Sequence, residues 1–164
     1  MATFSLKTIQ NLPVEIEEAW NFFSNPANLQ AITPGNLGFK IISHHHGTVM
    51  YPGQIIEYKV SPVLGIPLYW MTEITHVEQN RYFIDEQRYG PYKMWHHQHH
   101  FRAIEGGTEM TDIVHYKIPF WGLGKIANAV MVRSQLRTIF NYRFKAVNER
   151  FGVWPGGEPE IRIY

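Results

Sequence analysis

Residues 83–119 read FIDEQRYGPYKMWHHQHHFRAIEGGTEMTDIVHYKIP, and this stretch decides the fold class of the chain. Large aromatic side chains and a polar minority recur in it at every second position, which is the period of a β-strand and places each set on one face of a sheet. Turns at Gly90-Pro91 and Gly106-Gly107 divide the stretch, so it predicts consecutive antiparallel strands. Histidines and carboxylates suit a dry core poorly, and we therefore expect the face that carries them to line a pocket.

Further strands precede this stretch, and a long helix follows it. Earlier segments alternate between apolar and polar residues, whereas from Leu123 onward the apolar residues recur with helical spacing. The predicted elements are a strand at 3–10, short helices at about 14–24 and 25–31, strands at 37–43, 53–61, 67–78, 81–89, 93–104 and 109–118, and a helix at about 123–150.

Together these elements predict an α+β fold. We expect a curved seven-stranded antiparallel sheet around the long C-terminal helix, with two short helices after the first strand. Residues 1–152 are predicted to form a single domain, because Gly152 ends the helix. Residues 153–164 are predicted to be a C-terminal tail, in which Ile161 to Tyr164 either frays or pairs with a neighbouring strand.

The composition argues against several classes of function. Lysine and arginine number 15 against 14 aspartate and glutamate residues, with no run of like charge, so we expect no nucleic-acid partner. The absence of cysteine excludes disulfides, thiolate metal sites and cysteine nucleophiles, and it fits a reducing cytoplasm. No apolar stretch approaches the roughly 20 residues of a membrane span, so we expect a soluble, cytoplasmic protein whose oligomeric state stays open. The motifs of serine hydrolases, P-loop proteins and dinucleotide-binding proteins are also absent.

The chain resembles the SRPBCC superfamily, also called START-like or Bet v 1-like. The resemblance in layout covers about residues 3–151, and its sharpest motifs are Phe83-x-Asp85-x-Gln87, Gly90-Pro91-Tyr92, Trp95-x-His97-x-His99-x-Phe101 and Asp112-x-Val114-x-Tyr116-x-Ile118-Pro119. More narrowly, the chain is similar to a bacterial branch labelled as ligand-binding or "cell division inhibitor" domains. The resemblance implies a helix-grip fold with a deep cavity, between the sheet and the last helix, for lipids, polyketides or other apolar molecules. It implies no shared catalytic residue, because a fold alone does not determine function, and we expect no cofactor.

His97, His99 and Asp112 are the candidate polar residues of the cavity. With Gly106-Gly107 as a two-residue hairpin turn, His99 and Asp112 become diagonal neighbours. The predicted opposite pairs are Phe101 with Asp112, His99 with Val114, and His97 with Tyr116. Either Asp112 fixes the tautomer of His99 and leaves its other nitrogen for a ligand, or these groups satisfy one another and stiffen the sheet.

The same three residues have the ligand types of a two-histidine, one-carboxylate metal site. The sequence shows neither an evident fourth ligand nor an outer partner that would orient the histidines. We therefore predict no functional metal.

Most of the other predicted ligand-binding residues are apolar. They are Trp70, Trp95, Phe101 and Tyr116 on the strands and Val130 and Met131 on the last helix. Asp85 and Gln87 either join the polar end of the pocket or anchor the Gly90-Pro91 turn. Two further histidine-rich groups are expected at the surface: His96, Gln98, His100 and His115 on the outer strand face, and His44 to His46 in a loop near the cavity mouth.

These observations predict a protein that binds or transports a hydrophobic small molecule. One alternative is a polyketide cyclase- or aromatase-like enzyme that uses His97, His99 and Asp112 as acid-base groups. Another is a protein-interaction module whose cavity is vestigial. Because no nucleophile motif is present, a non-catalytic role is favoured.

Overall fold

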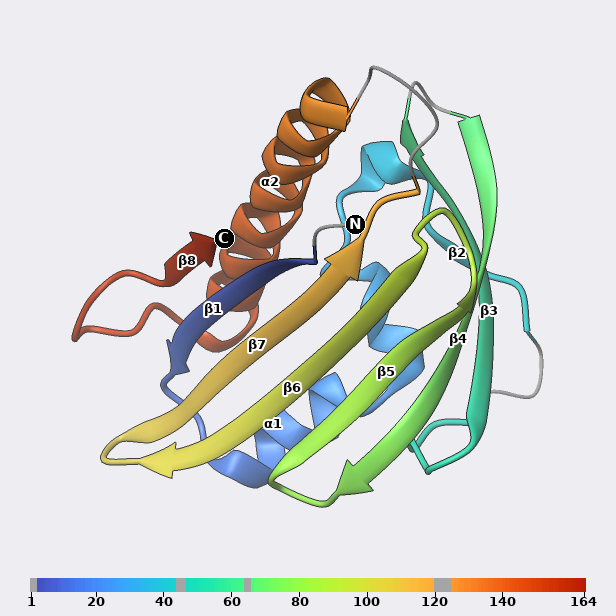
Figure 1. The fold of residues 1–164 in the computed structure, drawn as a ribbon. Helices are drawn as coiled ribbons and strands as arrows, with labels where there is room; N and C mark the ends of the chain where they lie inside the picture. The colour runs from blue at the N-terminus through green and yellow to red at the C-terminus, as the bar shows by residue number, and fades with distance from the viewer. Residues whose placement is uncertain (1–2, 44–46, 64–65, 120–124) are drawn as a thin grey trace.

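The computed structural model describes residues 3–43, 47–63, 66–119 and 125–164, which form one curved antiparallel sheet with helices on its inner side (Figure 1). The helices are α1 Ile16–Phe23, the short 3-10 helices η1 Pro26–Gln30 and η2 Gly35–Leu37, and α2 Lys125–Phe151. The strands are β1 Phe4–Leu12, β2 Lys40–Ile41, β3 Gln54–Val63, β4 Ile66–Glu78, β5 Tyr82–Tyr89, β6 Met94–Ile104, β7 Gly107–Lys117 and β8 Glu160–Ile163. Within these residues the strand order is β2-β3-β4-β5-β6-β7-β1-β8.

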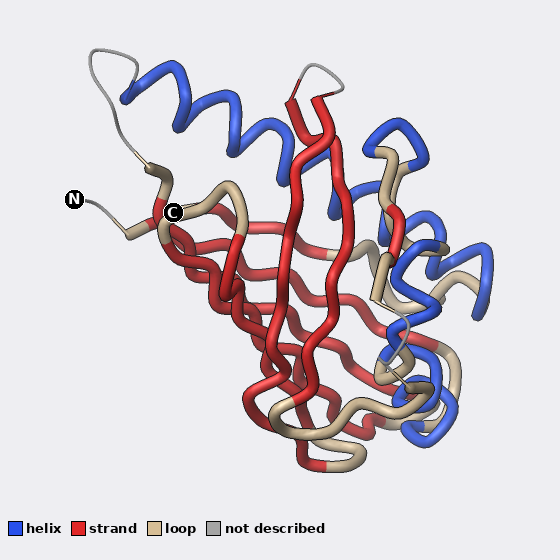
Figure 2. The backbone as a smooth tube through the Cα atoms, turned by 90° about the vertical axis from the view of Figure 1, so that its right-hand side faces the viewer, coloured by secondary structure: helices blue, strands red, loops and turns tan. Residues whose placement is uncertain are grey.

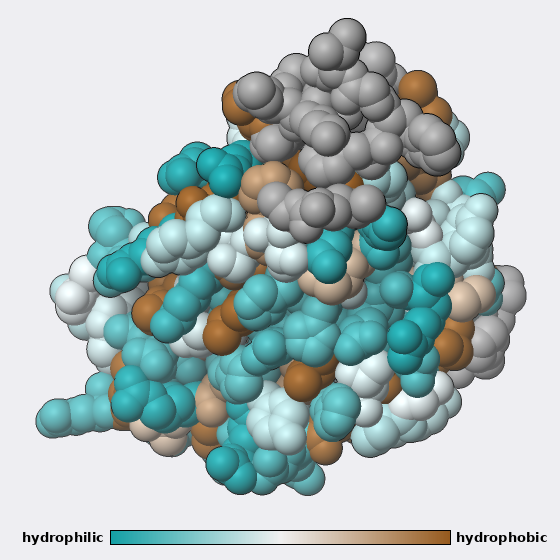
Figure 3. Space-filling view, viewed as in Figure 1, coloured by the Kyte–Doolittle hydropathy of each residue, from teal (hydrophilic) through white to brown (hydrophobic). Residues whose placement is uncertain are grey.

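The predicted α+β architecture is confirmed: a long C-terminal helix is held by a curved sheet. Figure 2 shows the bend of the sheet and the helices gathered on one side of it. The opposite, outer face of the sheet is mostly hydrophilic (Figure 3). None of the helices in the described residues combines the length and the apolar character needed to cross a membrane.

The sheet has eight strands in the described residues, one more than predicted. The additional strand is β8, which pairs antiparallel with β1 from Leu6↔Ile163 to Ile9↔Glu160. Ile161 and Ile163 pack against the apolar side chains between β1, β7 and α2. This pairing satisfies backbone groups at the edge of β1 and partly buries the two isoleucines. Fraying and pairing were both expected for Ile161 to Tyr164, and the structure shows pairing.

The short helices follow their sequence signals. Glu17 and Glu18 lie in the first turn of α1, near its positive dipole end, and Trp20 and Phe23 are buried on its inner face. Asn25 accepts a hydrogen bond from the backbone N–H of Ala27 at 3.0 Å and so caps η1. The strand predicted at 37–43 is shorter than expected, because η2 occupies its beginning and only Lys40 and Ile41 pair with β3.

The β6–β7 hairpin corrects the predicted register. Its turn is Glu105-Gly106, since Ile104 pairs with Gly107, and Gly106 has a left-handed φ of 80° that suits glycine. His99 therefore lies directly opposite Asp112, and His97 lies opposite Val114. The predicted pairs were wrong by two positions, which keeps every side chain on its predicted face because strand side chains alternate with period two.

The apolar interior of the described residues forms three clusters. The α1 cluster contains Trp20, Phe23, Phe83 and Phe101 among others. The α2 cluster contains Leu6, Val114, Leu136, Phe140 and Phe144, and the η2 cluster contains Leu37, Val60 and Trp70. Members of all three clusters line the same cavity, which is where the candidate site lies.

Candidate functional site

A cavity of about 160 Å³ lies between the inner face of β3–β6, the segment around η1 and η2, and α2. Its walls are mainly aromatic and aliphatic. The lining residues are Leu29, Thr33, Leu37, Phe39, Met50, Ile56, Tyr58, Val60, Trp70, Thr72, Ile74, Phe83, Asp85, Tyr92, Trp95, His97, His99, Gln135, Leu136, Ile139, Phe140 and Arg143. The lining also includes Asp85 of β5, His97 and His99 of β6, and Arg143 of α2. The cavity therefore combines apolar walls with a charged region.

Two histidines of β6 form the centre of the charged region. His97 and His99 are two positions apart and therefore project from the same face of the strand. Both are buried, at 5% and 4% exposure, and their ring centroids lie 3.7 Å apart. Asp85 on β5 is in register with His97, and Asp112 on β7 is in register with His99, so the hairpin pairings bring a carboxylate to each side of the histidine pair.

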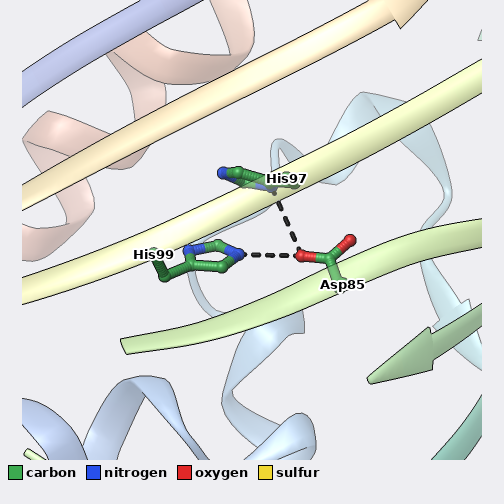
Figure 4. A group of neighbouring side chains, drawn as sticks. All are labelled: Asp85, His97 and His99. Atoms are coloured by element: carbon green, nitrogen blue, oxygen red, sulfur yellow. Dashed lines mark hydrogen bonds and ion pairs between the residues drawn. The ribbon is translucent and has the colours of Figure 1, made fainter. Parts of the chain in front are cut away.

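Each histidine lies between both carboxylates. His97 Nε2 is hydrogen-bonded to Asp112 Oδ1 at 3.0 Å, and His97 Nδ1 lies 3.5 Å from Asp85 Oδ2. His99 Nε2 is hydrogen-bonded to Asp85 Oδ2 at 2.8 Å (Figure 4). His99 Nδ1 lies 2.8 Å from Asp112 Oδ1, but the N–H direction misses that oxygen and no hydrogen bond forms to any described residue.

The contacts within the cluster separate the protonation states of the two histidines. Burial would lower the pKa of His99, but its contacts with Asp112 and Asp85 hold that pKa above its ordinary value. Burial lowers the pKa of His97, and the neighbouring charge of His99 lowers it further. The surroundings therefore favour protonation of His99 over protonation of His97.

The two carboxyl groups both stay ionised. Burial alone would raise the pKa of Asp112, but the hydrogen bond from His97 and the contact with His99 hold it well below its usual range. The pKa of Asp85 is also lowered, because the charges and the hydrogen bond of the histidines outweigh its burial. The charge of Arg143 also lowers the pKa of Asp85, so this arginine and protonation of His99 both offset the two carboxylates.

Arg143 on α2 is the member of this cluster that the sequence analysis missed. Its Nη1 lies 3.7 Å from Asp112 Oδ2, and its guanidinium carbon lies 4.9 Å from the centre of the Phe140 ring. Its Nε and Nη1 are buried and have no hydrogen-bond partner among the described residues. The sequence does contain a sign of this role. Arg143 falls between the buried residues Phe140 and Val147 on the helix, and a charged residue on a buried stripe indicates a polar partner in the interior.

Thr8 also escaped the sequence analysis. It is opposite Asp112 in the β1–β7 pairing, and its hydroxyl donates to Asp112 Oδ2 at 3.3 Å. No sequence pattern marks this threonine, because the contact depends on the pairing of the first strand with the seventh.

The structure places the predicted strand residues at three different locations. Trp70, Trp95, Asp85, His97 and His99 line the cavity. Asp112 lies behind the two histidines and is not part of the cavity wall. Phe101 belongs to the α1 cluster, and Tyr116 is buried against Phe4 in the α2 cluster, so both are core residues.

Gln87 anchors the turn rather than the cavity. Its Nε2 donates to the carbonyl oxygen of Tyr92 at 2.7 Å, and its Oε1 accepts from the Tyr92 backbone N–H at 3.2 Å. Gln87 therefore closes the turn at Gly90-Pro91, whereas Asp85 on the same strand face reaches the histidines.

Val130 and Met131 do not line the cavity, contrary to the prediction. They are 62% and 46% exposed, whereas the buried stripe of α2 runs through Val132, Leu136 and Phe140. Both groups of residues fit a broad apolar stripe in the sequence, and only the packing of α2 on β1 and β7 decides which edge of that stripe is covered.

The other histidine-rich segments lie apart from this cluster. On the outer face of the sheet, His96 is hydrogen-bonded to Glu86 at 2.9 Å and to Gln98 at 3.1 Å, and His100 is bonded to Gln98 at 2.9 Å. His115 lies beside His96 on the same face. His44 to His46 lie outside the described residues.

Comparison with solved structures shows which class of fold this is. The protein TTHA0849 from Thermus thermophilus matches with a TM-score of 0.67 and 13% identity over 90% of this chain and 96% of that protein. The major latex-like protein 151 from Panax ginseng matches with a TM-score of 0.66 and 13% identity over 92% and 99% of the two chains. Ara h 8.0201 matches with a TM-score of 0.62 and 13% identity over 92% and 98%.

The chain therefore has the Bet v 1-like helix-grip fold. At such low identity the likeness concerns the fold, and the site must be interpreted from its own residues. No protein-family model and no curated protein sequence matches the chain.

Proposed function

We propose that the protein binds a small hydrophobic molecule in the cavity between the sheet and α2. The observation that carries this proposal is the composition of the cavity lining, in which aromatic and aliphatic walls enclose a single charged group of side chains. Small-molecule sites in proteins have this character, with a few polar groups that fix the orientation of the ligand.

The size of the cavity limits the ligand. A cavity of about 150 Å³ holds one benzene-sized molecule, and the cavity here measures about 160 Å³. The best fit is a compact ligand of about one ring, and a long acyl chain would require the walls to move.

The polar end favours a ligand with an oxygen acceptor. Arg143 presents two buried nitrogens, Nε and Nη1, that donate to no described residue, and a buried donor without a partner is costly. A carbonyl or carboxylate oxygen on the ligand would satisfy these donors. The ligand class is therefore a single-ring aromatic or similarly compact apolar molecule that carries such an oxygen.

Binding is better supported than acid-base catalysis. A cyclase-like reaction would need a ring nitrogen that is free to exchange a proton with the ligand. All four ring nitrogens of His97 and His99 lie within 3.5 Å of a carboxylate oxygen. The histidines line the cavity, but their nitrogens are engaged with Asp85 and Asp112.

Binding can be tested with benzoate and acetophenone as single-ring probes and dodecanoate as a long-chain probe. We expect the two ring compounds to bind with one-to-one stoichiometry in isothermal titration calorimetry and to change the fluorescence of Trp70 and Trp95, which line the cavity. Native mass spectrometry of freshly purified protein, followed by organic extraction, would identify a natural ligand that copurifies.

A matched pair of helix variants controls the location. Ile139 lines the cavity from α2, so Ile139→Trp should fill it and abolish probe binding, whereas Val130→Trp on the exposed side of the same helix should bind like the wild type. Absence of a copurifying ligand together with absence of probe binding would overturn the proposal. Equal binding by both tryptophan variants would overturn the assigned location.

A further inference from the structure

We infer that Asp85, His97 and His99 form a binding site for a divalent transition-metal ion at the charged end of the cavity (Figure 4). The sequence analysis predicted no functional metal, because it grouped the histidines with Asp112 and found no outer partner for them. In the structure the two carboxylates have the opposite roles. Asp85 supplies the third ligand, and Asp112 is the outer partner. The inference does not depend on the organic ligand proposed above.

The Asp85 carboxylate oxygen lies at the distance from each histidine that binding to one ion requires. Two donors bound to one ion at about 2.0–2.2 Å, with angles of about 90–110° between them, are about 2.8–3.6 Å apart. Asp85 Oδ2 lies 2.8 Å from His99 Nε2 and 3.5 Å from His97 Nδ1. One donor atom from each of the three residues lies within 4.8 Å of the others, so a small movement of the rings would bring all three to one ion.

Asp112 lies on the far side of both histidines and orients His97 for this role. Its Oδ1 lies 3.0 Å from His97 Nε2 and 2.8 Å from His99 Nδ1, which are the ring nitrogens directed away from Asp85. His97 Nε2 carries the proton that Asp112 accepts, which leaves a lone pair on His97 Nδ1. His99 Nε2 is hydrogen-bonded to Asp85, so an ion would have to displace the Nε2 proton into solvent before this nitrogen could bind. Metal-binding histidines usually donate their second N–H to a carboxylate, and that contact fixes the tautomer and the ring orientation. His97 makes this hydrogen bond, whereas His99 Nδ1 lies close to the same oxygen without one.

The surrounding charges leave Asp85 available to the ion. Arg143 is placed toward Asp112, with Nη1 3.7 Å from Asp112 Oδ2, so these two charges offset each other behind the histidines. Thr8 donates to the same oxygen of Asp112. The carboxylate of Asp85 is therefore the anion on the ion's own side of the cluster.

The site has open coordination positions that face the cavity. Asp85, His97 and His99 belong to the cavity lining, and Asp112 does not. Three protein ligands with an open side are typical of ions that bind a further exogenous ligand, and two histidines with one carboxylate suit Zn²⁺ or Fe²⁺. An anionic group on that open side would meet the unpartnered N–H groups of Arg143.

The test uses the full chain after treatment with a chelator, titrated with Co²⁺ alone while visible absorption is recorded. We expect one equivalent to bind with the spectrum of a nitrogen- and oxygen-ligated ion. Asp85→Asn and His99→Gln should each abolish this binding. Asp112→Asn keeps all three ligands and should weaken binding about 10- to 100-fold, as loss of an outer partner does.

Histidines outside the cluster are the main source of false binding, and two control variants remove groups of them. One replaces His44, His45 and His46 with asparagine, and the other replaces His96 and His100 on the outer face with glutamine. Both should retain the Co²⁺ spectrum and the affinity of the wild type. The inference is overturned if either control variant abolishes binding, if Asp85→Asn retains it, or if the wild type binds no Co²⁺.

A measurement on the wild type keeps the test decisive if the ligand variants do not fold. Bound Co²⁺ is paramagnetic, so it should shift the NMR signals of Trp95 and Phe83, which line the cavity near the histidines. It should leave the signals of Trp154, near the turn at Gly106, unchanged. The reverse pattern would place the ion elsewhere and overturn the site.

Discussion

At the scale of single residues, the main feature is a buried group of charges that neutralise one another. Asp112 is only 3% exposed and contacts His97, His99, Thr8 and Arg143. A buried charge is tolerated when partners surround it, and removing one partner leaves the others unpaired in a medium of low dielectric constant. The stability of the inner sheet face therefore depends on this carboxylate.

Replacing Asp112 with asparagine should lower the free energy of unfolding by about 3–5 kcal/mol near neutral pH, because it removes the carboxylate beside Arg143 and one of the two carboxylates beside His99. Glu109→Gln on the same strand is the matched control, since its ion pair with the 69%-exposed Arg102 lies at the surface and should contribute less than about 1 kcal/mol. Urea denaturation in the presence of a chelator measures both effects. Equal losses in the two variants would contradict the role of the buried cluster.

The same carboxylate makes this difference depend on pH. The folded-state pKa of Asp112 is below its unfolded value of 3.8, so its contribution is fully present above that value and is lost as the pH falls toward the folded-state pKa. The stability gap between the wild type and Asp112→Asn should therefore shrink below about pH 4. A gap that stays constant down to about pH 2 would show that Asp112 is not held ionised by its partners.

Part of this buried cluster could be predicted from the sequence, and part could not. His97, His99 and Asp112 were identified because polar residues in an alternating strand pattern attract attention. Arg143 and Thr8 were missed, since their contacts to Asp112 come from two other elements, α2 and β1, that pack beside β7. Only the three-dimensional packing brings these segments to one carboxylate.

At the scale of secondary-structure elements, strand parity was predictable and strand register was not. Each inner-facing residue of β6 and β7 lies on its predicted face, yet the predicted opposite pairs were displaced by two positions. Parity depends on the alternation within one strand, whereas register depends on which residues form the turn. Choosing between Glu105-Gly106 and Gly106-Gly107 required the backbone conformation of Gly106.

Gly107 follows this turn, at a point where β7 lies very close to β1. A substitution there measures how much a closer contact between the two strands costs. A Cβ at this position would lie 2.0 Å from the carbonyl oxygen of Leu12, which is too close for any side chain. Gly107→Ala should therefore destabilise the fold by about 1–3 kcal/mol, as overpacking typically does. The measurement is the free energy of unfolding in urea.

Gly35→Ala serves as the control for the loss of a glycine. No atom lies within 4 Å of a Cβ built there, and Gly35 does not have a left-handed φ. It should leave stability within about 0.5 kcal/mol of the wild type. A neutral Gly107→Ala would mean that β1 can move away from the hairpin without cost.

At the scale of the whole molecule, the packing of α2 against the curved sheet determines the size of the cavity between them. Leu136 is 2% exposed and lines the cavity from α2, so Leu136→Ala should both enlarge the cavity and destabilise the fold by about 2–5 kcal/mol. The larger cavity should admit a bicyclic probe such as 2-naphthoate, and a probe present at 100 times its Kd should restore about 2.7 kcal/mol. Calorimetric titration and thermal unfolding with and without the probe measure both effects.

Leu6→Ala separates the gain in cavity volume from the loss of stability. Leu6 is fully buried in the α2 cluster but does not line the cavity. Its replacement should destabilise the protein to a similar extent without creating binding of 2-naphthoate. Binding of this probe by both variants would indicate general loosening of the interior rather than an enlarged cavity.

The two ends of the sheet have a consequence for how copies of the chain meet. Among the described residues, the outermost strands are β2, with two residues, and β8, with four, whereas the longest strand, β4, has thirteen residues and lies between two neighbours. Short outer strands offer few unpaired backbone groups to a second chain, which is a common protection against edge-to-edge aggregation. β8 therefore covers four of the nine residues along the edge of β1. This pairing leaves fewer backbone groups on β1 to pair with a second chain, which helps to keep the protein from polymerising.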